Sequence, residues 1–489
     1  QEYREYERTS TVAANAYIGP RVDGYLAEVE RYLAQQAFPG RFLVVQSTGG
    51  LYDVSQAQQE CIRMLESGPA AGVIGTRMLC ASLGIDRAIA FDMGGTTAKA
   101  ALIEDGVVTF DSLYYVGGFE HGYPVQTSVV DVVEVGAGGG SIAWIDEVGA
   151  LKVGPQSAGA DPGPICYMGG GKEPTITDAN VVLGRLDPDQ FLGGQMKLDV
   201  DGARHGIKKK IAEPLNLEVV AAAEAIVDIA ISKMSLAVRE VSVAKGYDPR
   251  DFALVASGGA GPLHVIAIAR ELHVPTVIIP LFPSNFSALG MLVADERHDY
   301  TRTYYADLEN VDFKQLVTIH DEMVKEASKG LRRNKAPDFQ VHLDLRYVGQ
   351  EFTLQVPVTL DQLKTGDRKA IRTAFDEMYE HRYAHHSPDE AVELVNIRLG
   401  AIGKRAKLKF PSLGAAGEAK PAGERKAYFS SATEALTAKV YRREQLGAGA
   451  ELSGPALIQE HGTTTVLFEN DHCRVAPSGE LIISIGGVR

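Results

Sequence analysis

A β-hairpin is predicted at residues 89–103, which read Ile-Ala-Phe-Asp-Met-Gly-Gly-Thr-Thr-Ala-Lys-Ala-Ala-Leu-Ile. Residues 89–91 and 98–103 are short apolar runs, which is typical of two buried strands, and Gly94-Gly95 supplies the tight turn between them. An acid, Asp92, stands before the glycines, and two hydroxyl residues follow them. An acid, a glycine turn and hydroxyls between two strands indicate a phosphate-binding loop, whereas the alternative is an ordinary hairpin without a ligand.

The turn has the chemical groups that a phosphate site needs. Gly94 and Gly95 lack a Cβ, so backbone N–H groups can come close to a phosphate, and the hydroxyls of Thr96 and Thr97 add further donors. The carboxylate of Asp92 cannot bind phosphate directly. We therefore expect Asp92 to hold Mg²⁺ through water, since Mg²⁺ keeps most of its water ligands.

A second glycine cluster lies further along the chain, at residues 254–264, which read Leu-Val-Ala-Ser-Gly-Gly-Ala-Gly-Pro-Leu-His. The pattern predicts a strand that ends at Gly258, Gly259 and Ala260 and a helix at 265–272. A helix N-terminus that follows glycines is a ready nucleotide site. In this order, the two motifs resemble the second phosphate loop and the adenosine loop of the actin-like ATPase superfold.

The composition limits the classes to which the protein can belong. The 489 residues suggest two or three domains, and the net charge of −14 argues against nucleic-acid binding. No apolar run approaches the roughly 20 residues of a membrane span, and no signal peptide is apparent, so we expect a cytoplasmic protein without a membrane segment. The chain begins with Gln1, which leaves a fragment, a processed product and part of a longer chain all open. We expect the four cysteines to be small buried hydrophobes without disulfide or zinc partners: Cys61, Cys80, Cys166 and Cys473.

The character of the chain changes near residue 295, from alternating strands and helices to an α+β pattern. We therefore expect an α/β domain at 1–295 and an α+β domain at 296–489. Within the first domain, the pattern predicts a helix at 12–18 capped by residues 9–11, a second helix from Pro20, and a loop at 280–288.

Three motifs in the sequence leave alternatives open. The glycine run at 136–141 is too dense for a strand interior and indicates either a strained or flexible loop or a place where a ligand meets backbone. Thr177 or Asp178 is expected to cap a helix, with a catalytic role for Asp178 as the alternative. Histidines stand at 381, 385 and 386, and a pair spaced i, i+4 could bind a metal if the segment is helical. No third ligand is obvious, so we expect these histidines to lie on the polar surface or to pack.

These motifs, in this order, resemble the A subunit of the hydantoinase/oxoprolinase family along essentially the whole chain. The matching segments are residues 4–8, 46–50, 67–72, 91–96, 136–141, 154–159, 177–180, 257–262, 346–350, 392–396 and 454–458. The resemblance implies an actin-like ATPase (ribonuclease H-like) core followed by an α+β C-terminal domain. Members of the family begin with a first phosphate loop that has no copy in this sequence, so that half of the nucleotide cleft is expected from elsewhere. Lys99 is a further departure, since many members carry Asp there.

The resemblance also implies an activity: ATP, with Mg²⁺, phosphorylates the carbonyl of a small cyclic amide, and a B-type subunit of a hetero-oligomer completes ring opening. Asp92 and Thr96 would be the catalytic residues, with Asp92 holding the metal. The nucleotide would lie against Gly94, Gly95, Thr96, Thr97, Gly258, Gly259 and Ala260. The alternatives are the ATP-using subunit of an acetone- or acetophenone-type carboxylase, or a nucleotide-binding subunit without catalysis.

Overall fold

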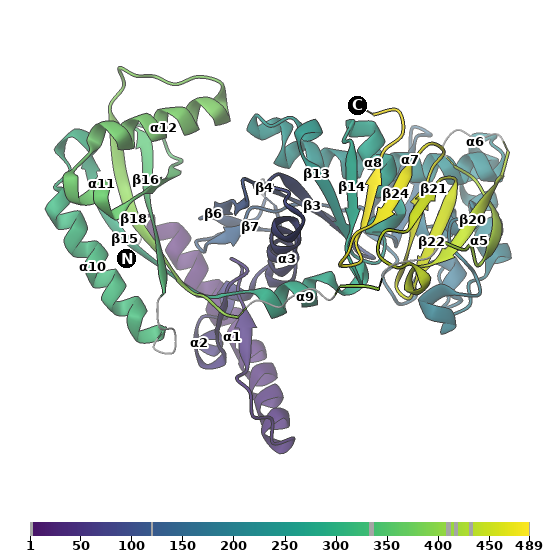
Figure 1. Ribbon diagram of the computed structural model, residues 1–489, viewed down its shortest axis with the longest axis horizontal. Coiled ribbons are helices and arrows are strands. Elements are labelled where there is room, and N and C mark those ends of the chain that lie inside the picture. The colour runs from purple at the N-terminus through teal and green to yellow at the C-terminus, as the bar shows by residue number, and fades with distance from the viewer. Residues whose placement is uncertain are drawn as a thin grey trace. The chain divides into compact units, whose positions relative to one another are not determined.

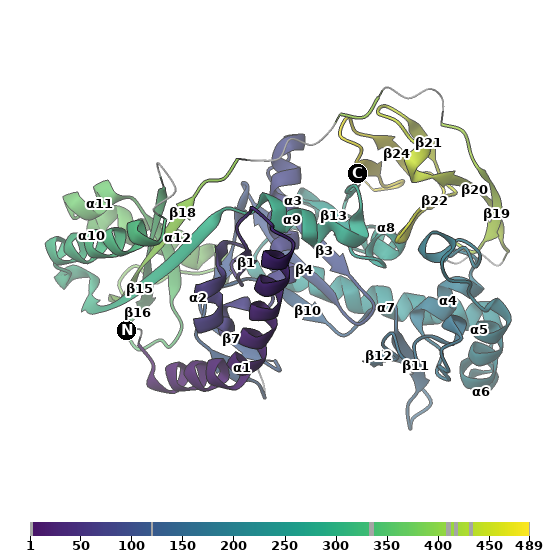
Figure 2. The same ribbon diagram turned by 90° about the horizontal axis from the view of Figure 1, so that it is seen from below.

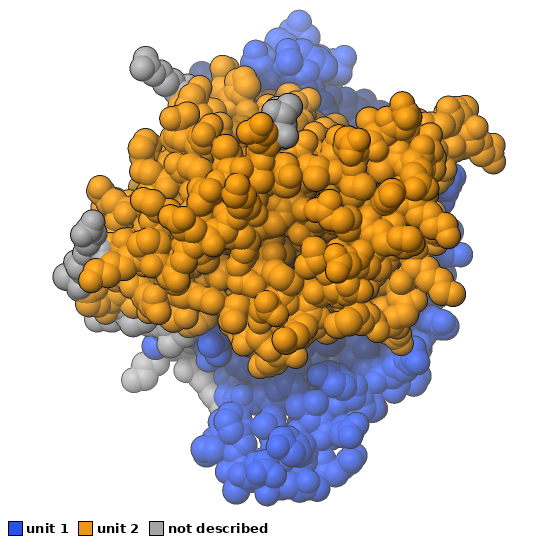
Figure 3. Space-filling view, turned by 90° about the vertical axis from the view of Figure 1, so that its right-hand side faces the viewer, with its two compact units in different colours: residues 1–74, 109–130, 291–408 blue, residues 75–108, 131–290, 409–489 orange. Residues whose placement is uncertain are grey.

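The computed structural model describes residues 3–118, 121–331, 337–406, 412–414, 419–429 and 434–488. The chain divides into two compact units, each built from three separate segments of the sequence (Figure 3). Unit 1 comprises residues 1–74, 109–130 and 291–408, and unit 2 comprises residues 75–108, 131–290 and 409–489. The division of the sequence into 1–295 and 296–489 stays a prediction.

Unit 2 is organised around a sheet with the strand order β10-β4-β3-β13-β14-β25-β24-β21, to which β5 adds at β4. The antiparallel pair β3–β4 is the predicted hairpin, and β13 runs parallel to both β3 and β14. This order, with one antiparallel hairpin beside parallel strands, is that of a ribonuclease H-like half. The strands are β3 (Ala88–Met93), β4 (Ala98–Glu104), β5 (Val107–Val108), β10 (Val133–Val135), β13 (Ala253–Ser257), β14 (Thr276–Ile279), β21 (Glu451–Ser453), β24 (His472–Val475) and β25 (Leu481–Ser484).

Helices cover this sheet because its central strands are apolar on both faces. All five residues of β13 are buried, as expected of a strand with layers on either side. Helix α7 (Val219–Val241) packs on β4 and β10, and α8 (Gly261–Leu272) connects β13 to β14 and contacts both. Figure 1 shows α8 beside β13 and β14. Even α7, the long apolar helix, does not qualify as a membrane span, nor does any other helix among the described residues.

The remainder of unit 2 consists of smaller elements. A second sheet has the order β19-β20-β22-β23, and β11 and β12 form a separate hairpin. The elements are β11 (Ser141–Ile145), β12 (Leu151–Ser157), α4 (Ile176–Val182), α5 (Val200–Ile207), α6 (Glu213–Leu215), β19 (Gly423–Ala427), β20 (Leu436–Arg442), β22 (Ala456–Glu460) and β23 (Thr463–Leu467).

Unit 1 has its own sheet, with the order β1-β2-β15-β18-β16-β17. Helices α10, α11 and α12 cover one face of it (Figure 1), and Leu343, Ile397 and Phe375 are fully buried between the two layers. The elements are β1 (Leu43–Val45), β2 (Leu51–Asp53), α2 (Val54–Gln59), β15 (Glu296–Asp307), α10 (Phe313–Gly330), β16 (Asp338–Tyr347), β17 (Leu354–Val358), α11 (Leu360–Thr365), α12 (Arg368–Tyr383) and β18 (Val392–Gly403). Two short ribbons, β6 (Phe110–Asp111) with β9 (Val129–Val130) and β7 (Tyr114–Val116) with β8 (Tyr123–Val125), complete the unit.

The N-terminal helix corrects the sequence prediction. Instead of two helices, α1 runs from Glu5 to Gln35 with Pro20 inside it, and Arg4 rather than residues 9–11 precedes its first turn. The hydroxyls of Thr9 and Thr11 bond back to the carbonyls of Glu5 and Glu7, as Ser and Thr do inside helices. The helix bends along its length in Figure 2, the expected effect of an internal proline.

Two helices cross the boundaries between units in the sequence: α3 (Ser67–Leu83) and α9 (Phe286–Val293). The predicted loop at 280–288 is therefore wrong in its last residues, because a short 3-10 turn at Pro283–Asn285 leads into α9 at Phe286. Pro280 and Pro283 marked this segment as irregular. Its apolar continuation, with Phe286 fully buried, forms the helix through tertiary packing.

We expect the core of unit 2 to depend on the side chain at the start of the phosphate hairpin. Phe91 is fully buried in β3, so Phe91→Ala leaves a cavity and lowers the free energy of unfolding by about 3–5 kcal/mol. Val107→Ala, at a residue that is 64% exposed, is the matched control and changes little. The free energy of unfolding of both variants is measured by urea unfolding, followed by the fluorescence of Trp144. Trp144 is the single tryptophan and belongs to unit 2. Equal midpoints for the two variants would contradict this account of the core.

Candidate functional site

The turn of the hairpin forms as predicted. The amide of Gly94 donates to the carbonyl of Thr97 at 3.1 Å and closes the turn between β3 and β4. Gly95 and Thr96 at its tip are exposed, whereas Asp92 and Thr97 are half-buried. The backbone and hydroxyl groups expected to meet a phosphate thus lie at the surface of unit 2.

Two glycine segments pack directly on this turn. Gly139 and Gly140 donate their amides to the carbonyls of Gly94 and Gly95, at 3.1 and 2.7 Å. On the other side, Ala260 donates its amide to Met93 at 3.0 Å. The structure therefore brings the predicted phosphate hairpin and the predicted adenosine loop into contact.

Side chains are excluded where these segments touch. A Cβ on Gly138 would lie 2.4 Å from the amide nitrogen of Thr96. A Cβ on Gly258, whose φ is +85°, would lie 2.1 Å from the carbonyl oxygen of Met93. The glycine run at 136–141 therefore permits close approach to the backbone of the hairpin itself. The two sequence alternatives, a strained or flexible loop and a place where a ligand meets backbone, stay predictions.

Helix α4 begins with a capping box that corrects the predicted cap. Thr175 is the N-cap, and Asp178 occupies the third helical position with its carboxylate turned back to the Thr175 amide at 2.9 Å. Asp178 also accepts the amides of Ile165 and Cys166, at 3.2 and 2.8 Å. It is completely buried, so it anchors the preceding loop to the helix rather than facing the turn at 94–97.

Helix α4 also contacts both loops that the sequence predicts to bind nucleotide. Thr177 donates its hydroxyl and its amide to the carbonyl of Gly139, at 2.8 and 2.9 Å. Asn180 contacts His264 through its Nδ2, 3.0 Å from Nε2, and Nδ1 of the same ring lies 3.0 Å from the carbonyl oxygen of Ala260. One helix therefore supports the phosphate hairpin through Gly139 and the adenosine loop through His264.

The bonding partners fix the state of His264. Its Nδ1 faces a carbonyl and must carry the proton, whereas Nε2 faces an amide N–H₂ group and must accept. Burial lowers the pKa of His264 to about 4, so the ring is neutral at physiological pH. The pair is a positioning contact, not a proton donor for chemistry.

The carboxylate of Asp92 has a mixed environment. Burial raises the pKa of Asp92, while the charge of Lys99 and a long 3.5 Å contact from the Ser287 hydroxyl oppose that change. Lys99 itself lies 3.7 Å from Glu134. One carboxylate beside an exposed turn fits a magnesium ion held through water, because such an ion needs few direct protein ligands and its charge would favour the ionised acid.

The histidine cluster lies in unit 1 and makes local contacts. His386 forms an ion pair with Glu380 at 2.8 Å, and the ring of His385 packs edge-on against Tyr379. Over the ranges that the structure describes, no group of three or more His, Cys, Asp or Glu residues could hold a metal. The four cysteines are buried and free.

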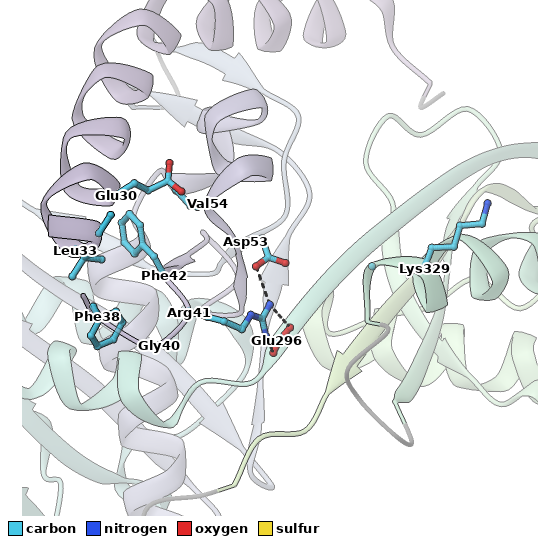
Figure 4. Close-up of a pocket in the computed structure, with 12 residues that line it drawn as sticks. Glu30, Leu33, Phe38, Gly40, Arg41, Phe42, Asp53, Val54, Glu296 and Lys329 are labelled. Atoms are coloured by element: carbon cyan, nitrogen blue, oxygen red, sulfur yellow. Dashed lines mark hydrogen bonds and ion pairs between the residues drawn. The ribbon is translucent and has the colours of Figure 1, made fainter. Parts of the chain in front are cut away.

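Unit 1 also contains a cavity of about 480 Å³ between the end of α1 and the start of β15 (Figure 4). Arg41 bridges two of its three acids, with Nη2 2.9 Å from Asp53 and Nη1 2.7 Å from Glu296. Phe38 and Phe42 lie on the α1 side. Arg41, Asp53 and Glu296 are thus engaged with one another, and the lining also contains the charged residues Glu30 and Lys329.

Sequence reasoning missed the contribution of His264 and Asn180. Asn180 lies in the matched segment 177–180 and His264 in the glycine cluster at 254–264, but they are separated by 84 residues, and no local pattern pairs them. The pairing of Thr177 with Gly139 was missed for the same reason, since 38 residues separate them.

The strand order and the supported hairpin define the class: an α/β protein with an actin-like ATPase core. The family model for hydantoinase/oxoprolinase matches residues 8–300, and the model for the hydantoinase/oxoprolinase C-terminal domain matches residues 306–476. The chain therefore belongs to the hydantoinase/oxoprolinase family.

Three relatives illustrate the family. An uncharacterized protein of Methanocaldococcus jannaschii is 41% identical, over 95% of this chain and 68% of that protein. Caprolactamase subunit alpha of Pseudomonas jessenii is 35% identical, over 95% of this chain and 68% of that subunit. The crystal structure of the ATP-dependent caprolactamase from that organism superposes with a TM-score of 0.89 and 33% identity, over 99% of this chain and 71% of that chain. The nucleotide-free structure of acetone carboxylase gives a TM-score of 0.78 and 27% identity, over 99% and 70% of the respective chains.

The contact between α4 and the glycine run yields a first prediction for the site. Thr177→Val keeps the shape of the side chain but removes the hydroxyl donor to Gly139, so the phosphate turn loses part of its support. We expect the affinity for Mg²⁺-ATP to fall about tenfold, the effect of roughly 1.4 kcal/mol. Calorimetric titration measures it, with Thr365→Val in unit 1 as the control. Unchanged affinity in Thr177→Val would show that the hydroxyl does not support the site.

The buried imidazole yields a second prediction. Because its folded pKa of about 4 lies below the ordinary value of 6.5, the ring contributes stability that is full above pH 6.5 and declines as pH falls toward 4. Long-range ¹H–¹⁵N spectra should show the Nδ1–H tautomer of His264 from pH 8 to pH 5. An imidazolium signal at pH 6 would contradict the assignment.

Proposed function

We propose that the chain is the ATP-using component of a cyclic amide hydrolase of the hydantoinase/oxoprolinase type. The observation that supports it most is the phosphate hairpin, backed by two glycine segments, in a chain that superposes on an ATP-dependent caprolactamase with a TM-score of 0.89. The carbonyl carbon of an unactivated lactam is a poor electrophile, and phosphorylation of the carbonyl oxygen by ATP activates it. In this proposal the carbonyl oxygen of the amide attacks the γ-phosphorus, ADP leaves, and the resulting imidate phosphate is open to water.

Each predicted residue has a defined task in this proposal. Phosphoryl transfer needs mainly positioning and neutralisation of charge. The amide of Gly95 and the hydroxyls of Thr96 and Thr97 would hold the phosphates, whereas the amide of Gly94 closes the turn by donating to the carbonyl of Thr97. Asp92 would hold hydrated Mg²⁺, which when bound neutralises phosphate charge.

The adenosine loop completes the assignment. Gly258, Gly259 and Ala260 would lie along the nucleoside, since a glycine loop that opens α8 brings backbone amides to a helix N-terminus. The Ala260 amide is bonded to Met93, so Ala260 would hold the loop in register rather than bind the nucleotide through its own N–H. Ring opening is assigned to a B-type subunit in a hetero-oligomer, and the cytoplasmic location stays a prediction.

A carboxylase role is the second candidate, and a specific observation favours it: the acetone carboxylase structure also covers 99% of this chain. In that case ATP would activate the enolate of a ketone and bicarbonate. The higher TM-score with caprolactamase, 0.89 against 0.78, is the reason we put the amide hydrolase first.

The nucleotide site is tested by calorimetry with Mg²⁺-ATP. We expect the parent chain to bind and the double variant Asp92→Ala, Thr96→Ala to lose at least tenfold in affinity, because the metal-holding acid and a phosphate donor are both removed. Removal of Mg²⁺ with a chelator should weaken ATP binding by the parent chain and leave ATP binding by the double variant unchanged. Glu147→Ala, in the turn between β11 and β12, is the control.

Turnover separates the candidate functions. With its B-type partner, the chain should hydrolyse ATP faster when a lactam or hydantoin is added, and a ketone with bicarbonate should have no effect. If the ketone with bicarbonate stimulates ATP hydrolysis and the lactam and hydantoin do not, the carboxylase role is favoured. Nucleotide binding without stimulation by either substrate class would leave a non-catalytic subunit, and equal binding by parent and double variant would remove the assigned site.

A further inference from the structure

A third loop, residues 280–285 between β14 and α9, lies at the edge of the sheet that carries the phosphate hairpin and the adenosine loop. Strand β13 runs parallel to both β3 and β14, so the carboxyl ends of these three strands meet at one edge. The turn at 94–97 follows β3, the glycines at 258–260 follow β13, and the third loop follows β14. In open α/β sheets, ligands bind outside the carboxyl ends of the strands. The third loop is therefore placed where a bound nucleotide can meet it.

Three contacts connect the third loop, the adenosine loop and the turn between β22 and β23. Gly258 donates its amide to the carbonyl of Pro283 at 2.8 Å. A Cβ on Gly462 would lie 2.3 Å from the Oγ of Ser284, and a Cβ on Gly259 would lie 3.4 Å from the carbonyl oxygen of Gly462. The three loops thus contact one another in pairs, and all of them belong to unit 2.

Phe282 is the exposed aromatic residue of the third loop. Its side chain is 71% exposed, and no aromatic ring or cation among the described residues contacts it. Phe286, four residues later, is by contrast fully buried. A single exposed apolar side chain is ordinary by itself, so the exposure of Phe282 acquires meaning only with its backbone and its place in the fold.

The backbone of Phe282 is strained. Its φ of 53° and ψ of 53° lie in the left-handed region, which is unfavourable for a residue with a bulky side chain. The carbonyl of Phe282 accepts the amide of Asn285 at 2.9 Å, and the next carbonyl, that of Pro283, is bonded to Gly258. The flanking hydrogen bonds therefore hold the strained conformation, and strain of this kind gathers at ligand sites. Glycine or asparagine would suit this backbone better, so the aromatic ring calls for a reason other than the fold.

We propose that the ring of Phe282 stacks on the base of the nucleotide that the adenosine loop holds. This assignment rests on the proposed function in one respect, since it needs a nucleotide beside Gly258 and Gly259. A base is flat and offers an aromatic face, and an exposed aromatic side chain binds such a face well. Stacking accepts any base, so Phe282 adds affinity for the nucleoside and does not choose among bases.

Calorimetric titration with Mg²⁺-ATP and with Mg²⁺-tripolyphosphate, which has three phosphates and no nucleoside, tests this role. In Phe282→Gly we expect the affinity for ATP to fall about tenfold, the effect of one lost stacking contact, and that for tripolyphosphate to stay within about twofold. Phe282→Tyr keeps a ring and should bind ATP within about twofold of the parent. Phe352→Gly, at a residue of unit 1 that is 59% exposed, is the matched control and should bind ATP like the parent.

The glycine variant separates binding from folding. Glycine adopts a positive φ without strain, so we expect Phe282→Gly to keep the melting temperature of the parent while it loses affinity for ATP. Equal ATP affinity in the parent and in Phe282→Gly would overturn the proposal. An equal loss for ATP and tripolyphosphate would overturn it too, because the ring would then support the loops and not the base.

A spectroscopic signature comes from Phe282→Trp. A base stacked on the new indole should quench its fluorescence, so we expect quenching by ATP and none by tripolyphosphate. The parent, in which Trp144 is the single tryptophan, gives the background signal. If ATP binds to Phe282→Trp without quenching the added signal, the base does not stack at this position and the proposal is wrong.

The outcome is separable from that for the proposed function. ATP affinity that is lost in the double variant Asp92→Ala, Thr96→Ala but kept in Phe282→Gly leaves the proposed function standing and removes Phe282 from the site. ATP binding that depends on Phe282, without stimulation of ATP hydrolysis by a lactam or hydantoin, keeps the stacking role and removes the hydrolase assignment. Full ATP affinity in Phe282→Gly together with weakened binding of the B-type subunit would overturn the stacking role and assign the ring to a protein interface.

Discussion

Backbone packed on backbone at the phosphate hairpin is the constraint on which the rest of unit 2 depends. The amides of Gly139 and Gly140 meet the carbonyls of Gly94 and Gly95, and Gly258 closes in from the other side. Neither Gly138 nor Gly258 leaves room for a Cβ. A turn clamped in this way is held in one shape, so it can be positioned before a ligand arrives and need not be ordered by it.

Helix α4 connects the packed hairpin to other segments of unit 2. Its capping box is built on Asp178, which also holds the preceding loop. Thr177 and Asn180 of the same helix contact Gly139 and His264. Apart from the Asp178 carboxylate, these contacts are between neutral groups, and the ring of His264 stays uncharged because it is buried. Uncharged buried contacts avoid the desolvation cost of an ion pair, which suits a support that must keep one geometry over a range of pH.

Unit 1 is held together by apolar packing and by ion pairs. One face of its main sheet is buried under α10, α11 and α12 by ordinary apolar packing. Charged residues elsewhere in the unit pair among themselves, as Arg346 does with Glu393 at 2.5 Å and Arg398 with Asp344 at 2.8 Å. Such pairing gives each of these charges a partner where it is removed from water.

The sequence by itself determined the local elements whose signal is short-range. The hairpin at 89–103 and the strand before Gly258 were predictable because an apolar run and a glycine turn are neighbours in the chain. The tertiary structure alone decided which segments meet. Asn180 and His264 are 84 residues apart, α1 continues through Pro20 although local signals end a helix there, and Thr175 caps α4 in place of Thr177 or Asp178. Each of these outcomes depends on contacts that form only after distant segments pack, and a single sequence carries no local record of them.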